Sequence, residues 1–247
     1  MAFGMEIYDA NGVLQADCNL LSYFCRKSGT GTTVAPTGVG NTTPSKGVIP
    51  TAGLGYTYPL IAVVCSGYSV ARVGNSTSTD MTFACSAPTG TSFSYYIFDY
   101  SPALPASSFG IELYNASGQR TFSSNYFPMQ AIGILTSGSV THTGKTLAVG
   151  MPELGGYRTA GQIDYYLGGM QVIPDWGYDS TGYQNDSKLY GGTISNSGQT
   201  LTYSTVSFDD VYVGPQFGDI YVPPDWNYQC PILAIDVSNI PASTTFF

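Results

Sequence analysis

Polar and apolar residues alternate near the start of the chain with the two-residue period of a β-strand. Met5 and Ile7 alternate with Glu6 and Tyr8, and turn-forming residues ending in glycine follow over 9–12. The chain then returns through a second short run of apolar and polar residues. An extended run, a glycine-bearing turn and a second run predict a β-hairpin.

The opening segment occurs twice. Residues 3–12 return 106 positions later as residues 109–118, and six of the ten positions are identical. The segment that precedes the second copy also has a counterpart at the end of the chain, since Phe-Asp-Tyr-Ser and Leu-Pro-Ala-Ser match Ile-Asp-Val-Ser and Ile-Pro-Ala-Ser. A recurring start and a recurring end predict two tandem domains related by internal duplication, 1–106 and 107–247.

The other apolar runs are short, and glycine or proline separates them about every eight to twelve residues, which is typical of sandwiches and barrels. No run of helical length has helical periodicity, so we expect an all-β fold of two β-sandwich-like domains. Residues 28–55 are rich in Gly, Thr, Pro and Ser and are expected to form a long loop with at most one short strand. Further strands are expected at 59–65, 69–73, 81–85, 94–99, 130–135, 146–150, 163–167, 170–173, 192–195, 200–208, 211–213, 220–222 and 232–237.

The second unit is longer than the first, with 141 residues (247 − 106) against 106. The extra length is expected as an insertion in the Gly/Tyr/Asp-rich stretch at about 150–230. This stretch also holds most of the net charge of −8, because eight aspartates between 164 and 225 face the single Lys188. Nucleic-acid binding is therefore not expected, since phosphate recognition needs a cationic face.

Charged residues make up only 10% of the chain, and the five cysteines match no zinc-binding spacing. The low charge favours a protein whose surface is covered in an assembly, because free monomers generally rely on charge for solubility. The odd cysteine count favours reduced, mostly buried thiols. The N-terminal sequence has no basic segment followed by an apolar core, and no apolar run is long enough to span a membrane, so neither a signal peptide nor membrane insertion is expected.

The hairpin segments resemble a known group of proteins. Residues 95–100, the Pro/Ser-rich bridge after them and residues 109–119 are similar to a recurring segment of uncharacterised tail-region proteins of tailed bacteriophages and prophages. In those proteins an "FGL-x-[VIL]-[YF]-[DN]-A-[SN]-G" hairpin follows a "Y-x-[VI]-F-D" strand. Residues 2–12 resemble the way such proteins begin. The resemblance implies a virion component of the distal tail or tail tip, and it brings no catalytic residues with it.

Neither of two classes of catalytic site has support in the sequence. His142 is the only histidine, and neither a Gly-x-Ser-x-Gly elbow nor a jointly signalled nucleophile accompanies it, so a plain strand or loop histidine is favoured over a triad member. A polysaccharide-degrading tail hydrolase would use two carboxylates, but no pair stands out among the sixteen acidic residues. We therefore expect no enzymatic activity, and no cofactor is expected.

A second internal repeat holds both tryptophans. Pro-Asp-Trp-Gly-Tyr at 174–178 recurs as Pro-Asp-Trp-Asn-Tyr at 224–228. Three interpretations stay open: the rings fill the core, they anchor a protein interface, or they stack on sugar rings. The candidate ligand- or partner-binding residues are Trp176, Tyr178, Trp226 and Tyr228.

The aspartate cluster also offers oxygen ligands of the kind that Ca²⁺ prefers. Asp175, Asp179 and Asp186 lie close together in sequence, yet they do not form an Asp-x-Asp-x-Asp-Gly loop. A solvated acidic surface is favoured over a calcium site, and no metal is expected.

The sequence thus predicts a non-enzymatic structural component of a bacteriophage virion, placed in the distal tail, tail tip or baseplate. We expect it to be made in the bacterial cytoplasm, to form a homo-oligomer and to contact other tail proteins. The alternative is a host-surface receptor-binding module that recognises a glycan or a protein. A tail hydrolase is the least favoured alternative.

Overall fold

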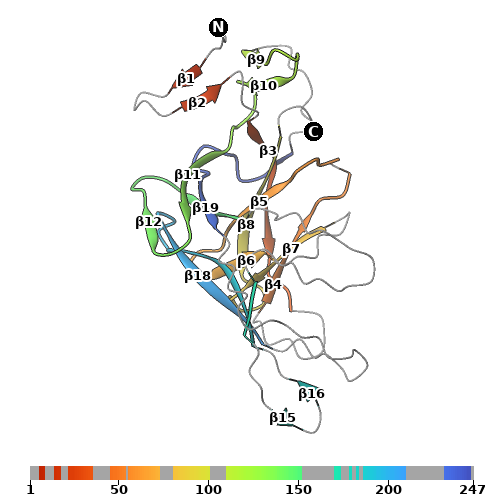
Figure 1. Ribbon diagram of the computed structural model, residues 1–247, viewed down its shortest axis with the longest axis vertical. Helices are drawn as coiled ribbons and strands as arrows, with labels where there is room; N and C mark the ends of the chain where they lie inside the picture. The colour runs from red at the N-terminus through yellow and green to blue at the C-terminus, as the bar shows by residue number, and fades with distance from the viewer. Residues whose placement is uncertain are drawn as a thin grey trace.

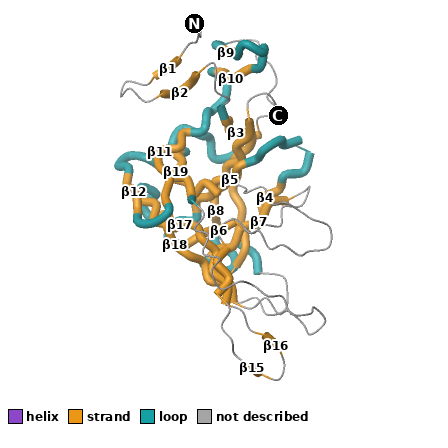
Figure 2. The backbone as a smooth tube through the Cα atoms, viewed as in Figure 1, coloured by secondary structure: helices purple, strands orange, loops and turns teal. Residues whose placement is uncertain are grey.

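The computed structural model describes residues 6–8, 14–17, 22–35, 45–53, 55–72, 80–100, 110–151, 170–173, 178–179, 182–183, 186–209 and 231–245. Within these ranges every regular element is a β-strand, so the all-β prediction is confirmed. Among the described residues no helix has the length and apolar character to cross a membrane. Figure 2 shows strands and loops, and no helix, in the part of the chain that the structure describes.

Two seven-stranded antiparallel sheets make up the body of the molecule. The first has the order β11-β19-β13-β5-β8-β3-β20, and the second has the order β12-β18-β17-β6-β7-β4, with β14 pairing β17. The strands of the first sheet are β3 (Tyr23–Thr32), β5 (Leu60–Val64), β8 (Ser92–Tyr100), β11 (Gln130–Leu135), β13 (Leu147–Met151), β19 (Ile232–Asp236) and β20 (Thr244–Thr245). Those of the second are β4 (Ser45–Pro50), β6 (Ser69–Arg72), β7 (Asp80–Cys85), β12 (Ser139–Thr141), β14 (Met170–Ile173), β17 (Asp186–Ile194) and β18 (Thr200–Asp209).

Three two-stranded ribbons lie outside these sheets. They are β1 (Glu6–Tyr8) with β2 (Leu14–Asp17), β9 (Glu112–Tyr114) with β10 (Arg120–Ser123), and β15 (Tyr178–Asp179) with β16 (Gly182–Tyr183). The first two are the hairpins predicted from the alternating pattern, and both lie at the same end of the molecule (Figure 1).

The core lies between the two seven-stranded sheets. Its largest fully buried side chains include Ile61 and Ile97 from the first sheet and Ile49, Phe83 and Leu201 from the second. Face-to-face packing of two antiparallel sheets around shared apolar side chains is the arrangement of a β-sandwich. A second apolar cluster covers the other face of the first sheet and includes Phe98 and Ile235.

Both sheets take strands from either side of residue 106. In the first sheet, β3, β8 and β5 precede this point and β11, β19 and β13 follow it, and the two groups meet where β5 pairs with β13. In the second sheet the groups β4-β7-β6 and β12-β18-β17 meet where β6 pairs with β17. Each group has the same order from its outer edge to the centre, so the two halves of the chain complete one sandwich.

Local irregularities recur at the spacing of the sequence repeat. The two hairpins each have one extra residue in the returning strand, at Gln15 and at Thr121. Strands β3 and β11 each have one extra residue opposite their inner neighbour, at Arg26 and at Ile132. Both pairs are 106 positions apart. The tandem duplication stays a prediction, and these matched bulges support it, because a bulge sets the register of everything beyond it.

The expected loop over 28–55, with at most one short strand, is wrong at 28–32 and 45–50, and residues 36–44 lie outside the described residues. Strand β3 continues to Thr32, and β4 covers Ser45–Pro50. Glycines in these strands face aromatic residues: Gly29 lies opposite Tyr95, Gly31 opposite Phe93, and Gly47 opposite Phe83. A Cβ atom on any of these glycines would come within 2.6 Å or less of the facing aromatic side chain, so each aromatic side chain fills the space that a side chain at the glycine would take. Glycine has a low β-propensity, which argues against a strand at these positions. The strands form nevertheless, because the facing rings occupy the space that glycine leaves.

Three of the five cysteines lie in the described ranges, and all three are free and buried, as the sequence predicts for them. Burial raises the pKa of Cys25 to about 12. The Sγ atoms of Cys65 and Cys85 are 3.6 Å apart in the core, and the hydrogen bond between them, together with burial, raises the pKa of Cys65. Cys25 and Cys65 are therefore uncharged thiols at neutral pH and help to fill the apolar interior.

Candidate functional site

The residues predicted as a binding site lie mainly outside the described ranges. Trp176, Trp226, Tyr228 and Asp175 all fall there. Tyr178 and Asp179 belong to β15, and Asp186 belongs to β17, where only the backbone is described. Both the aromatic site and the calcium site therefore stay predictions. Among the described residues no group of three His, Cys, Asp or Glu side chains is placed to hold a metal ion.

His142 lies just after β12, in the turn that leads to β13. Its backbone N–H donates to the carbonyl of Gln199, and its carbonyl accepts from the N–H of Lys145. The ring is half-buried, and its Nε2 atom has no hydrogen-bond partner among the described residues. These contacts agree with the interpretation of His142 as a plain loop histidine. Backbone hydrogen bonds hold the turn in which it lies.

The β9–β10 hairpin carries a connected cluster of polar side chains, and sequence analysis predicted this segment as a hairpin but not as a site. Its turn is fixed by Asn115, whose Oδ1 accepts the N–H groups of Ser117 and Gln119 at 3.0 and 2.9 Å. Gly118 has a φ of +73°, the left-handed region that glycine enters without steric cost. An asparagine and a glycine at these places thus determine where the chain turns.

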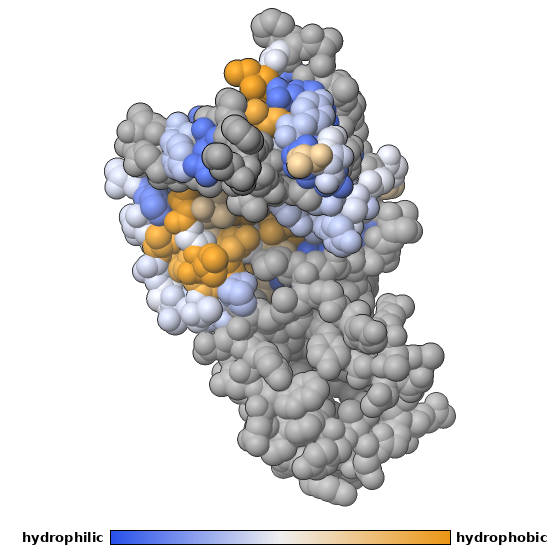
Figure 3. All heavy atoms as spheres, turned by 45° about the horizontal axis from the view of Figure 1, so that its top comes forward, coloured by the Kyte–Doolittle hydropathy of each residue, from blue (hydrophilic) through white to orange (hydrophobic). Residues whose placement is uncertain are grey.

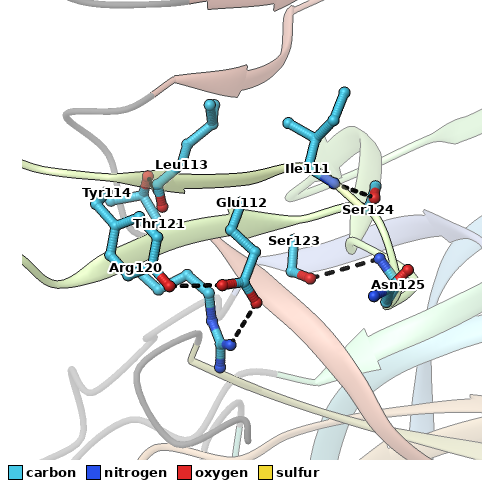
Figure 4. Close-up of polar contacts among 9 residues, drawn as sticks. All are labelled: Ile111, Glu112, Leu113, Tyr114, Arg120, Thr121, Ser123, Ser124 and Asn125. Atoms are coloured by element: carbon cyan, nitrogen blue, oxygen red, sulfur yellow. Dashed lines mark hydrogen bonds and ion pairs between the residues drawn. The ribbon is translucent and has the colours of Figure 1, made fainter. Parts of the chain in front are cut away.

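Three side chains of this hairpin form a charged network on one of its faces (Figure 4). The guanidinium of Arg120 contacts Oε1 of Glu112 at 2.8 Å, and the Tyr114 hydroxyl donates to the other carboxylate oxygen at 2.5 Å. Only 7% of the Arg120 side chain and 14% of the Glu112 side chain is exposed, so water screens the ion pair weakly. The hydrogen bond to Glu112 raises the pKa of Tyr114.

Aromatic packing attaches this hairpin to the sandwich. Phe24 at the start of β3 is fully buried, and its ring lies 6.0 Å from that of Phe122 and 6.2 Å from that of Tyr126. The Arg120 guanidinium lies 5.9 Å from the centre of the Tyr126 ring, within the range of a cation–π contact. The hairpin of the second half therefore rests on a strand of the first half.

The β1–β2 hairpin repeats part of this arrangement. The Tyr8 hydroxyl donates to the carboxylate of Glu6, as Tyr114 does to Glu112. Strands β2 and β10 lie side by side at the same end of the molecule (Figure 1). We name these two hairpins, residues 6–8, 14–17 and 111–123, the hairpin cap. Its largest exposed hydrophobic side chains are Tyr8, Ile111 and Tyr114, each just over half exposed.

Two buried aspartates hold loops at matched places in the two halves. Asp99 is fully buried, accepts the N–H groups of Thr57, Tyr58 and Tyr100 at 2.9 Å each, and lies 3.6 Å from the Arg26 guanidinium.

Asp236 accepts two hydrogen bonds from Ser238 and pairs with Lys145 at 2.7 Å. Burial acts to raise the pKa of Asp236, but the Lys145 and Ser238 contacts outweigh it and hold that pKa below its ordinary value. These contacts give both carboxylates a structural role, because each one fixes the loop that leads into a central strand.

Comparison with known proteins gives no relative. No family model, no curated protein and no solved structure matches the chain.

The Glu112 network leads to a test of the hairpin's local stability. Glu112→Gln removes the negative charge beside a nearly buried guanidinium, so we expect the hairpin to lose about 1.5–3 kcal/mol, the range for a hydrogen bond to a charged group. Native-state hydrogen exchange at the amides of 111–124 measures this loss. Glu6→Gln is the matched control, because Leu14 stands in β2 where Arg120 stands in β10, and a smaller loss is expected there. Equal losses in the two hairpins would contradict the role given to Arg120.

Proposed function

We propose that this protein is a non-enzymatic structural component of a bacteriophage virion, located in the distal tail, tail tip or baseplate. The observation that carries the proposal is the hairpin cap. The two segments that resemble phage tail-region proteins, near residues 3–12 and 109–118, form adjacent hairpins at one end of a β-sandwich. Each hairpin presents a half-exposed tyrosine whose hydroxyl is held by a glutamate.

A surface of this kind suits contact with another protein of the tail. Tyrosine combines a large apolar ring with a polar tip and is enriched at protein interfaces. The ion pair beneath Tyr114 and the turn at Asn115 keep the second hairpin in one conformation, so little side-chain entropy would be lost on binding. The low proportion of charged residues is also consistent with a surface that is covered in an assembly.

The test is whether the chain is part of the particle and whether the cap is needed for its incorporation. Mass spectrometry of purified virions from the phage or prophage that encodes this gene should detect the chain, and immunogold electron microscopy should place it on the tail. Tyr8→Ala combined with Tyr114→Ala should lower its incorporation at least tenfold. Tyr58→Ala is the matched control, since Tyr58 is 65% exposed outside the cap. Virions without the chain would refute the proposal.

Host-surface binding is the second candidate, and the repeated Pro-Asp-Trp segments favour it. If Trp176 and Trp226 read a glycan or a receptor protein, Trp→Ala at both positions should reduce adsorption to host cells and leave incorporation into virions unchanged. If they serve assembly or the core, the same change should reduce incorporation or stability. The two outcomes separate receptor binding from a purely structural role.

A further inference from the structure

Strand β11 is an outer strand of the first seven-stranded sheet, and among the described residues no strand pairs with its outer edge. None of its six residues is charged. Ile134 is 72% exposed, more than any other large hydrophobic side chain of the described residues, and Ala131 is exposed as well. Figure 3 shows apolar side chains gathered on a flank of the sandwich below the cap. An uncharged, apolar sheet edge is a template for pairing with another strand.

The counterpart of this edge in the first half is covered. Strand β3 matches β11 at a spacing of 106, and its outer edge pairs with β20, where Thr244 lies opposite Ser28 and Thr245 opposite Lys27. Further toward its start, β3 exchanges backbone hydrogen bonds with the segment that precedes β11, from Cys25 N–H to Phe127 and from Met129 N–H to Tyr23. The bulge at Arg26 thus does not prevent pairing on the outer side of β3. Since β11 has its bulge at the matched position, its outer edge is equally able to pair.

The pairing of β5 with β13 shows how two strand edges of the two halves join. Strands β5 and β13 join the two halves of the first sheet by antiparallel pairing, and Ala62 lies opposite Gly150. The strand residue two positions before Ala62 pairs with Phe98. The strand residue two positions before Gly150 pairs with Ile235, the counterpart of Phe98. Ala62 and Gly150 therefore occupy matched positions in the two halves. The join between the halves therefore has the antiparallel symmetry of a twofold axis, with small residues at its centre.

We propose that the outer edge of β11 binds β11 of a second copy of this chain, antiparallel and across a twofold axis, so that the first sheet continues from one copy into the other. A twofold contact uses the same patch on both copies, and an uncharged strand meets its own copy without like-charge repulsion. Within one molecule, β5 and β13 already pair edge to edge in this way. The proposed contact repeats this kind of pairing between two molecules. In this arrangement the pairing centres on Ile134, the most exposed large hydrophobic side chain of the described residues, so the two Ile134 side chains cover each other.

The test is the oligomeric state of the full chain, measured by light scattering after size exclusion at micromolar concentration. We expect the wild-type chain to be a dimer and Ile134→Lys to have half its mass. Ile111→Lys is the matched control, an exposed isoleucine replaced outside the proposed interface, and it should stay dimeric. Ile134→Glu should also be monomeric, and mixing it with Ile134→Lys should restore the dimer, because a twofold axis brings the two opposite charges together. Circular dichroism confirms that each variant is folded.

A monomeric wild-type chain would overturn the proposal, as would an Ile134→Lys variant that keeps the wild-type mass. Dissociation by Ile111→Lys would overturn it too, because the contact would then lie in the hairpin cap. A failure of the lysine and glutamate variants to associate on mixing would exclude twofold pairing at β11. These results do not depend on the proposed virion function, which is tested separately by the protein content of the particles.

Discussion

A Gly191→Ala variant should be among the most destabilised single substitutions in this protein. Gly191 lies in β17, where this strand meets β6 and the two halves of the second sheet join. A Cβ atom added there would lie 1.9 Å from the carbonyl oxygen of Val70 and 2.8 Å from the Cβ of Ala71. The nearest of these atoms is backbone and cannot rotate away, so the join must open. We expect a loss of about 3 kcal/mol or more, at or above the upper end for overpacking.

Gly133→Ala is the matched control, since it adds the same methyl group to another strand. The nearest atom to its Cβ would be the Cβ of Ala234 at 3.6 Å, an ordinary van der Waals contact. Its effect should lie within about 1 kcal/mol of zero, because alanine also removes some of the backbone entropy cost of glycine. Urea unfolding measures both variants. A Gly191→Ala chain as stable as Gly133→Ala would contradict the close approach of β6 and β17.

The second large effect is expected for Asp99→Ala. This substitution removes the acceptor of three backbone N–H groups and leaves the Arg26 guanidinium, which is only 5% exposed, without the carboxylate beside it. Removing one partner of a buried ion pair costs about 3–5 kcal/mol. We therefore expect a loss of that size, measured by urea unfolding. The loop before β5 should also exchange its amide hydrogens faster, because Thr57 and Tyr58 lose their acceptor.

Asp236→Ala gives the comparison for this second prediction. Asp236 occupies the matched position in the second half, but its partner Lys145 is 44% exposed and can return to water when the carboxylate is removed. The loss should therefore be smaller than for Asp99→Ala. Since the pKa of Asp236 is lowered in the folded protein, its charge stabilises the fold above the ordinary aspartate pKa and ceases to do so as the pH falls below it. Asp236→Ala should remove that part of the acid sensitivity.

Strands with strong local patterns could be predicted from the sequence. The runs 130–135 and 170–173 are strands with those bounds, and 200–208 differs by one residue from β18. Strands that rely on their neighbours could not. The glycines of β3 and β4 have no β-propensity of their own, and rings on facing strands fill their place. Strand β20 is only two residues long and exists through its pairing with β3.

Part of the candidate site could likewise be predicted from the sequence, and part could not. The two hairpins could be predicted because alternation and a glycine-bearing turn are local signals. The ion pair of Glu112 with Arg120 could not be identified from the sequence, because it depends on the pairing register that places Arg120 opposite Tyr114, on the face that Glu112 shares. The predicted strands at 163–167, 211–213 and 220–222 lie outside the described residues, as do both tryptophans, so the aromatic site is still a hypothesis.

The sharing of sheets between the halves had no signal in the sequence. A repeat of 106 residues is equally compatible with two separate sandwiches in tandem and with two halves of one. The choice depends on pairing between β5 and β13 and between β6 and β17, whose residues are ordinary strand residues with no mark of their partner. Register and partner choice are determined by the buried face as a whole.

The halves on either side of residue 106 form one cooperative sandwich, and differential scanning calorimetry of the full chain tests this most directly. If the halves share both sheets, the chain should unfold in one transition whose van't Hoff enthalpy equals its calorimetric enthalpy. Gly191→Ala, at the join, should lower the temperature of that single transition without splitting it. Two separate transitions in the wild-type chain, with only one of them moved by Gly191→Ala, would contradict the shared sandwich.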